Sequence, residues 1–200
     1  VLSAYKTVSA PFAGQVTESG LQKVVIEYEG HVAALNTKPL TAIVLQGLLA
    51  PLLESVNMVN APVVAKDHDI EVSETKHERE GDYHTLITVT VTTTTQTRSI
   101  AGTLFADKRP RVVQIKGIKV EAELGPHMLY VTNDDTPGFI GRLGTILGEN
   151  GINIATFHLG RLSQGKEAIC LVEVDGPIPD AIVQQVQALP QVQRVKALRF

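Results

Sequence analysis

Two hydrophobic periods alternate within residues 127–200, and this alternation is the strongest constraint on the fold. Apolar residues at every second position predict strands, and apolar residues every three or four positions predict helices. Helices are expected over 137–149 and 179–188, with Gly151 and Pro190 at their ends. Strands are expected over 128–133, 152–160, 167–175 and 192–200. The order βαββαβ predicts a ferredoxin-like sheet.

Residues 20–124 follow another pattern and predict a separate α+β domain with a meander sheet and one long helix. The long helix is expected over 39–56 because apolar residues recur at helical spacing and Pro39 suits a first turn. A short helix is expected over 62–66. Strands are expected over 21–29, 70–76, 84–95, 97–105, 111–115 and 118–123.

The segment Leu124-Gly125-Pro126 is a candidate linker between these two patterns. It divides the chain into a first domain, 1–124, and a second domain, 127–200. Residues 1–19 predict a weak helix interrupted by Pro11 and Gly14, which we interpret as a strap docked on the first domain.

Composition narrows the class of protein. The chain is 44% hydrophobic and 20% charged, which is typical of globular domains, and its net charge of -3 provides no general attraction for nucleic acid. No apolar run is long enough to cross a membrane. The single cysteine, Cys170, lies in an apolar run that predicts a buried, inert thiol. We therefore expect neither nucleic-acid nor membrane partners, and a reducing, cytoplasmic compartment.

The motifs of a dehydrogenase or a metal enzyme are missing. No Gly-x-Gly-x-x-Gly sequence follows a predicted strand, and Gly138, Gly141 and Gly144 are spaced by three within a predicted helix. The six histidines are scattered, without the spacing of zinc ligands. We expect no catalytic residue, cofactor or metal site in this chain.

The turn after the strand 128–133 carries the candidate binding chemistry. Asn133 and Asp135 stand at the strand end, and Pro137 is expected in the first turn of the next helix, whose free amides favour a carboxylate. Gly138 has no Cβ and allows close approach to those amides. Asp135 could hold an ammonium group, so these residues predict a site for a zwitterionic amino acid. The alternative is that Asp135 or Thr136 only caps the helix.

Asn153 favours the binding interpretation. It is an amide between Ile152 and Ile154, which is unusual for a core strand. In the predicted topology, the second strand of a neighbouring copy reaches this turn if two domains pair side by side. Asn133, Asp135, Pro137, Gly138 and Asn153 would then form one pocket shared by two subunits.

Residues 134–143 (Asp-Asp-Thr-Pro-Gly-Phe-Ile-Gly-Arg-Leu) and 150–154 (Asn-Gly-Ile-Asn-Ile) resemble the ACT domains, a family that binds amino acids at domain interfaces. Further segments resemble the C-terminal half of the long-form D-3-phosphoglycerate dehydrogenases, and the resemblance covers essentially the whole chain. These segments are 12–18 (Phe-Ala-Gly-Gln-Val-Thr-Glu), 47–49 (Gly-Leu-Leu), 56–62 (Val-Asn-Met-Val-Asn-Ala-Pro), 100–104 (Ile-Ala-Gly-Thr-Leu) and 111–115 (Arg-Val-Val-Gln-Ile).

This resemblance implies a regulatory fragment of an NAD-dependent oxidoreductase in L-serine biosynthesis. The NAD site and the catalytic residues would lie upstream of Val1. The effector would be L-serine or a related amino acid, held by the residues that match the family's serine contacts, Asn133, Asp135 and Asn153. Asn133 stands where other members have histidine or tyrosine. Homo-oligomers through both domain types are implied.

The resemblance also suggests an anion site in the first domain, at Lys108, Arg109 and Arg111, against the alternative of a solvated basic turn. Two other functions stay open. The same domain types occur in iron–sulfur L-serine dehydratases, although such clusters need several thiolates and this chain has one cysteine. The chain could also be a purely structural oligomerisation module.

Overall fold

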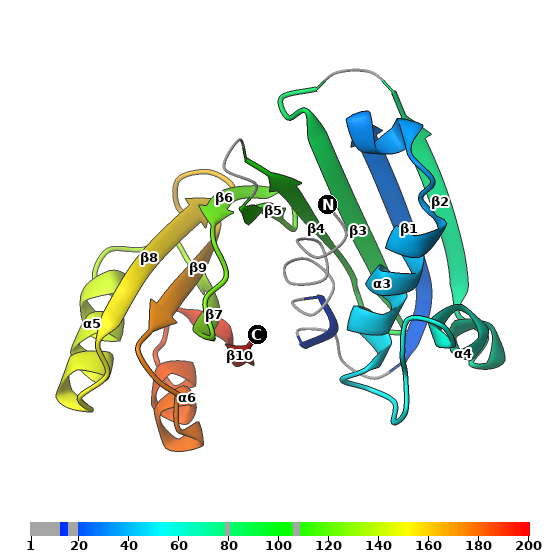
Figure 1. The fold of residues 1–200 in the computed structure, drawn as a ribbon. Helices are drawn as coiled ribbons and strands as arrows, with labels where there is room; N and C mark the ends of the chain where they lie inside the picture. Colours follow the sequence, from blue (N-terminus) through cyan, green and yellow to red (C-terminus); the bar gives the residue numbers. More distant parts are fainter. Residues whose placement is uncertain (1–12, 16–19, 79–80, 106–108) are drawn as a thin grey trace. The chain divides into compact units, whose positions relative to one another are not determined.

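A computed structural model describes residues 13–15, 20–78, 81–105 and 109–200 (Figure 1). The chain divides into two compact units, 1–116 and 117–200, and each is described by itself. Among the described residues, each unit combines a sheet with α-helices, so the predicted α+β class is confirmed.

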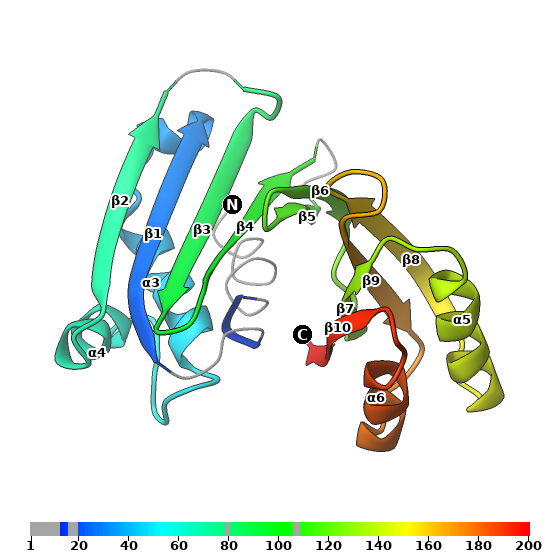
Figure 2. The same cartoon turned by 180° about the vertical axis from the view of Figure 1, so that it is seen from behind.

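The sheet of the first unit has the strand order β2-β1-β3-β4-β5 (Figure 2). Strands β3, β4 and β5 form the predicted meander of antiparallel neighbours, whereas β2 lies beside β1 and parallel to it. Parallel neighbours need a long crossover, which helices α3 and α4 provide. The elements are β1 (Leu21–Gly30), the 3-10 helix η1 (His31–Ala34), α3 (Lys38–Leu49), α4 (Ala61–Asp67), β2 (Glu71–His77), β3 (Thr85–Thr93), β4 (Thr97–Leu104) and β5 (Pro110–Ile115).

Helix α3 is shorter than the sequence predicts. It ends at Leu49 instead of near residue 56, because Pro51 has no N–H to continue the helical ladder. The amides of Leu52 and Leu53 both donate to the Leu49 carbonyl oxygen and close a turn. The helix buries one face, as its spacing predicts, through Leu40, Ile43, Val44, Leu45, Leu48 and Leu49.

The predicted strap over 1–19 lies outside the described residues except for 13–15. Within that piece, Gly14 lies against the last turn of α3. A Cβ on Gly14 would come within 2.5 Å of the Gly47 carbonyl oxygen, so no larger side chain fits without a backbone shift.

A chain of hydroxyl groups ties α3 to the sheet. The Thr41 hydroxyl donates to Glu74 Oε1 at 2.5 Å, so it accepts a hydrogen bond from the hydroxyl of Tyr28 at 2.8 Å. Thr37 donates to the other oxygen of Glu74 at 2.8 Å. Burial raises the pKa of Tyr28 to about 12, so the phenol stays protonated and remains a donor. These contacts join α3 to β1 and β2.

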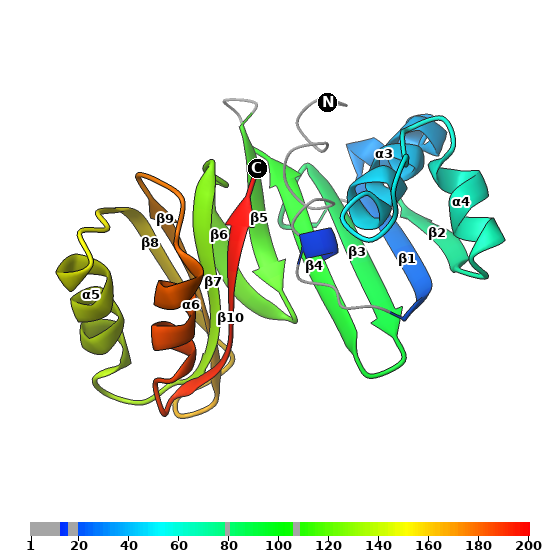
Figure 3. The ribbon, with the colours of Figure 1, turned by 90° about the horizontal axis from the view of Figure 1, so that it is seen from below.

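The second unit contains the predicted ferredoxin-like topology (Figure 3). Its sheet has the order β10-β7-β9-β8, and each pair of neighbours is antiparallel. Strand β6 packs against β8, where the Lys119 carbonyl oxygen lies so close to Gly160 that a Cβ would collide with it. The elements are β6 (Ile118–Ala122), β7 (His127–Asp134), α5 (Phe139–Glu149), β8 (Ile154–Arg161), β9 (Glu167–Val174), α6 (Asp180–Gln187) and β10 (Val192–Arg199).

Helices α5 and α6 lie on the same face of this sheet (Figure 3). The core between them and the sheet includes Leu129 and Val131 of β7, Leu143 of α5, Cys170 of β9 and Val186 of α6. Cys170 is fully buried, as predicted, and burial raises the pKa of its thiol to about 12. None of the described helices has the length and apolar character needed to cross a membrane.

Leu143→Ala removes a fully buried side chain from the core of the second unit. We expect a loss of about 2–5 kcal/mol in the free energy of unfolding, through lost burial and the cavity left behind. Amide hydrogen exchange in β7 and β9 measures this loss for the second unit alone. Thr145→Ala, at an exposed position of the same helix, is the control. A Leu143→Ala chain as protected as this control would contradict the described core.

Cys170 is expected to resist alkylation in the folded chain, because its thiol is both inaccessible and protonated. Iodoacetamide should modify it only after unfolding in urea, which mass spectrometry detects. A second cysteine placed at the exposed position 145, Thr145→Cys, should react in the folded chain and serves as the positive control. Equal modification rates at the two positions would refute the burial of Cys170.

Candidate functional site

The loop between β7 and α5 presents free backbone amides. Strand β7 ends at Asp134 and α5 begins at Phe139, with Gly138 as the N-cap at a left-handed φ of 91° that favours glycine. Pro137 was expected in the first turn of this helix, but it precedes the helix by two residues. Arg142 is the first residue whose N–H bonds back along the helix, to the Gly138 carbonyl oxygen at 3.0 Å. The amides of residues 139–141 have no partner within the helix.

No side chain caps this helix. The alternative interpretation of Asp135 and Thr136 as mere capping residues is therefore wrong. The carboxylate of Asp135 points elsewhere, and the Thr136 amide donates to the Asp134 carbonyl oxygen. The free amides at the start of α5 are left for another acceptor.

Asp135 joins this loop to the turn between β8 and β9. Its Oδ2 accepts hydrogen bonds from Arg161 Nη1 at 2.9 Å and from the Gly165 amide at 3.2 Å. The backbone N–H of Asp135 donates to the Lys166 carbonyl oxygen at 2.8 Å. The Arg161 guanidinium, with help from the Gly165 amide, holds the pKa of the Asp135 carboxyl below its ordinary value. Asp135 is therefore a carboxylate at neutral pH.

A cavity of about 320 Å³ opens between these two loops. Its polar residues are Asp135, Thr136, Arg161 and Gln164, beside the open start of α5. Such a cavity offers an acceptor for an ammonium group and donors for a carboxylate. The lining residues are Asp135, Thr136, Pro137, Gly138, Phe139, Ile140, Gly141, Arg161 and Gln164.

Asn133 does not line this cavity. Only 2% of its surface is exposed, its Nδ2 donates to the Asp134 carbonyl oxygen at 2.9 Å, and its Oδ1 is buried without a hydrogen-bond partner. Along β7, side chains alternate between the two faces, so Asn133 lies on the face of the core residues Leu129 and Val131. The predicted effector residues Asp135, Pro137 and Gly138 line the cavity, whereas Asn133 lies in the interior.

Asn153 lies at the far end of β8 from the cavity. Its Nδ2 donates to Asp175 Oδ2 at 2.8 Å. Strand β8 has eight residues and so extends over about 26 Å, which separates Asn153 from Arg161 at its other end. Within one chain, Asn153 and Asp135 therefore do not meet.

Arg161 and Gln164 were not predicted from the sequence, because the strand was expected to stop at residue 160. A signal was available in the topology. Strands β7 and β8 both pair antiparallel with β9, so they run in the same direction and end at the same edge of the sheet. A cation at the end of the second strand therefore meets a carboxylate at the end of the first.

The predicted anion site lies only partly in the described residues. Lys108 falls outside them. The Arg111 guanidinium lies over the Phe105 ring, with its central carbon 4.3 Å from the ring centroid, and the Phe105 amide donates to the Arg109 carbonyl oxygen at 3.2 Å. Arg111 thus makes a cation–π contact within its own unit. Anion binding at Lys108, Arg109 and Arg111 stays a prediction.

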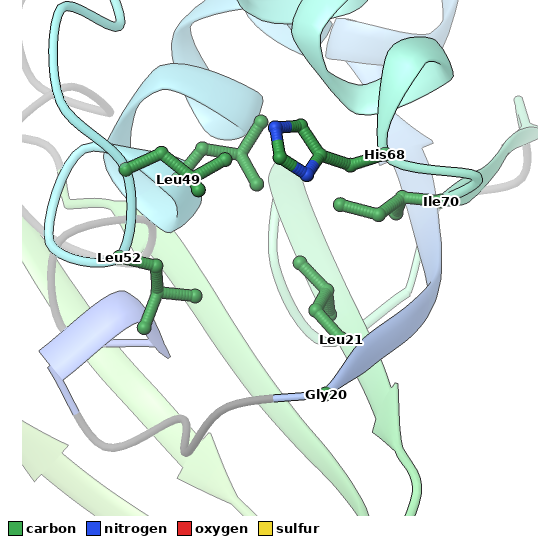
Figure 4. A pocket seen from close by; sticks show the side chains of 7 residues that line it. Gly20, Leu21, Leu49, Leu52, His68 and Ile70 are labelled. Atoms are coloured by element: carbon green, nitrogen blue, oxygen red, sulfur yellow. The ribbon is translucent and has the colours of Figure 1, made fainter.

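Another cavity, of about 330 Å³, lies in the first unit at the end of α3 (Figure 4). Leucine and isoleucine side chains surround it, and the polar side chain among its lining residues is that of His68. This cavity offers few polar groups, in contrast to the Asp135 cavity. The lining residues are Gly20, Leu21, Leu49, Leu52, Leu53, His68 and Ile70. Across the described part of the chain, no group of three or more His, Cys, Asp or Glu residues could hold a metal ion.

Two protein-family models match the sequence of this chain. The sequence model of the D-3-phosphoglycerate dehydrogenase intervening domain matches residues 9–116, which is more than half of the chain. The chain belongs to this family. The model of the ACT domain matches residues 127–191 and so covers the loop and the cavity described above.

Curated relatives carry both parts. The chain is 38% identical over 185 residues to the D-3-phosphoglycerate dehydrogenase of Bacillus subtilis (strain 168), which covers 92% of this chain and 35% of that protein. It is 31% identical over 187 residues to the Methanocaldococcus jannaschii protein of the same name, covering 93% and 35%. The Synechocystis protein of that name is 30% identical over 175 residues, covering 86% and 32%. The chain spans about a third of these relatives and corresponds to their C-terminal regulatory region.

Arg161→Gln is expected to raise the pKa of Asp135 toward its ordinary value of 3.8. In the folded chain this pKa lies below the unfolded value, so the ion pair stabilises the fold above the ordinary aspartate pKa. That contribution disappears as the pH falls through the folded-state pKa. NMR titration of the Asp135 carboxyl carbon measures the change. Arg142→Gln should leave the titration unchanged, because Arg142 reaches the Pro137 carbonyl oxygen instead.

Proposed function

We propose that this chain is the regulatory part of an NAD-dependent D-3-phosphoglycerate dehydrogenase and that it senses L-serine, or a closely related amino acid, at an interface between two ACT domains. The observation that carries the proposal is the cavity at the start of α5. It combines a carboxylate, a guanidinium and free helix amides. An amino acid carries the complementary ammonium and carboxylate groups.

The cavity suits such an effector electrostatically. Asp135 is ionised and offers its negative charge to an ammonium group. The free amides at the start of α5 line the cavity and would donate to a carboxylate, and the helix dipole favours a negative charge there. One chain supplies both kinds of group at a single cavity. Its own Asn153, however, lies at the far end of β8 and does not line this cavity.

A second copy would complete the site. Strand β8 is an edge strand of the sheet, with β9 as its only neighbour in the strand order. Two copies that pair antiparallel through β8 would place the start of one strand beside the end of the other. Asn153 of the second copy would then approach Arg161 and Asp135 of the first. A two-fold interface of this kind forms two equivalent pockets.

Effector binding at that interface would act on the parent enzyme through the arrangement of its subunits. A ligand that contacts both copies stabilises the paired state, and its differential affinity for the two arrangements is the coupling, on the order of 1–3 kcal/mol. The parent enzyme would bind NAD outside this chain and act in the cytoplasm, in the first step of L-serine biosynthesis.

Two rival functions remain to be tested against this one. A regulatory part of an L-serine dehydratase would share the ACT site, although the curated relatives named above are all dehydrogenases. A purely structural module would pair through β8 without binding an effector. Calorimetric titration with L-serine separates amino-acid sensing from the structural module, because a scaffold releases no heat of binding while its dimer stays intact. A dinucleotide-binding Gly-x-Gly-x-x-Gly motif upstream of this chain would separate the dehydrogenase from the dehydratase.

The shared site is tested by complementation between two variants. Asp135→Asn and Asn153→Ala should each abolish measurable L-serine binding, because every pocket then lacks one contact. Co-expression of the two variants gives mixed dimers with one intact pocket each. We expect about a quarter of the wild-type sites to return, since about half of the dimers are mixed and each regains one of two pockets. Calorimetry measures this stoichiometry.

Asn150→Ala provides a matched control for Asn153→Ala, because Asn150 lies at the end of α5, outside the cavity, and bonds the Ile146 carbonyl oxygen. Its affinity for L-serine should equal that of the wild type. Mixed dimers that bind no L-serine would exclude a pocket shared between copies. Full binding by the Asn153→Ala variant alone would place the effector contacts within one chain.

A further inference from the structure

The ion pair between Asp135 and Arg161 uses only part of each group. Both hydrogen bonds to the carboxylate end on Oδ2, and in the described part of the chain Oδ1 accepts none. The guanidinium contributes Nη1 to this pair and no other nitrogen. The Asp135 side chain is 20% exposed and the Arg161 side chain 55% exposed, and both line the cavity. An acceptor and several donors therefore lie side by side and unused.

We propose that Arg161 is a specificity-determining residue of this site: it binds the α-carboxylate of the effector while Oδ1 of Asp135 binds the α-ammonium group. This inference deepens the proposed function and rests on it. The Arg161 guanidinium is planar and carries five N–H donors. With one nitrogen held by Asp135, the remaining edge is oriented for a carboxylate in the two-pronged geometry that arginine favours.

Asp135 and Gly165 keep the guanidinium in place before the effector arrives. The Gly165 amide fixes Oδ2, and Oδ2 in turn fixes Arg161 Nη1. The Arg161 side chain therefore loses little further conformational entropy when the effector binds, because Asp135 already holds it. The α5 amides lie along the same cavity and would donate to the same effector carboxylate as Arg161. A carboxylate can accept about four hydrogen bonds, so the two sets of donors do not exclude each other.

The charges define the class of ligand. Asp135 and Arg161 are the charged residues among those lining the cavity, and their charges cancel. A zwitterionic α-amino acid, also neutral overall, places each charge against its opposite. An amine without a carboxylate meets repulsion from Arg161, and a carboxylic or phosphorylated acid without an amine meets repulsion from Asp135. The site therefore selects for a ligand that carries both groups.

The test compares two ligands on two proteins. L-Serinamide keeps the ammonium group of L-serine and replaces its carboxylate with a neutral amide. Arg161→Gln should weaken L-serine binding about tenfold to a hundredfold, the range for losing a charged hydrogen-bond partner. Binding of L-serinamide should not weaken, because its neutral amide does not use the guanidinium charge and its ammonium group is no longer repelled by Arg161. Calorimetry on the 200-residue chain gives all four affinities.

Two further variants separate recognition from support. Arg161→Lys keeps the positive charge and should recover part of the preference for L-serine over L-serinamide. Arg199→Gln removes a cation from the other edge strand, β10, and should leave both affinities unchanged. Amide spectra should confirm that the Arg161 variants keep the wild-type fold.

Each outcome decides the question. If Arg161→Gln weakens L-serine and L-serinamide by the same factor, Arg161 only positions Asp135 and the inference is wrong, while amino-acid sensing stands. If L-serine binds Arg161→Gln as tightly as the wild type, the α5 amides alone hold the carboxylate and the inference is again wrong. If the wild-type chain binds no L-serine or related amino acid, both the proposed function and this inference fall.

Discussion

The carboxylate of Asp135 is the contact on which the candidate site depends. It accepts hydrogen bonds from a guanidinium and an amide that lie 26 and 30 residues further along the chain. The ferredoxin-like sheet makes this possible, because β7 and β8 end at the same edge with β9 between them. The α5 amides open beside the same edge, since Gly138 turns the chain into the helix without a capping side chain. The ion pair between Asp135 and Arg161 thus joins the two loops that line the cavity and supplies its charged groups.

Regulation in this scheme follows from an incomplete binding site. Each chain presents a carboxylate, a guanidinium and helix amides at one end of β8, and an amide side chain at the other end. An edge strand with open backbone groups readily pairs with another copy. The side-by-side arrangement proposed above would give the effector contacts in both copies, and ligand binding would then act on the arrangement of subunits.

The buried faces of the helices and strands could be predicted from the sequence, whereas the end of helix α3 and the environment of Asn133 could not. The six elements of the ACT unit occur in the predicted order, because each buries apolar side chains at its own period. Helix α3 stops short because a single proline removes a donor. Asn133 was expected in the effector site; the alternation of β7 turns its side chain toward the core, and its role as an effector contact stays a prediction.

The sequence by itself determined the element order of both units, the buried faces of their helices and strands, and the loop in which Asp135, Pro137 and Gly138 occur. These features depend on neighbours within a few positions, so local periodicity and turn chemistry encode them. Only the tertiary structure decided that Asp135 pairs with Arg161, that Asn133 is buried, and that Asn153 lies far from the cavity of its own chain. Those relations depend on how the sheet brings distant segments together, which no local pattern encodes.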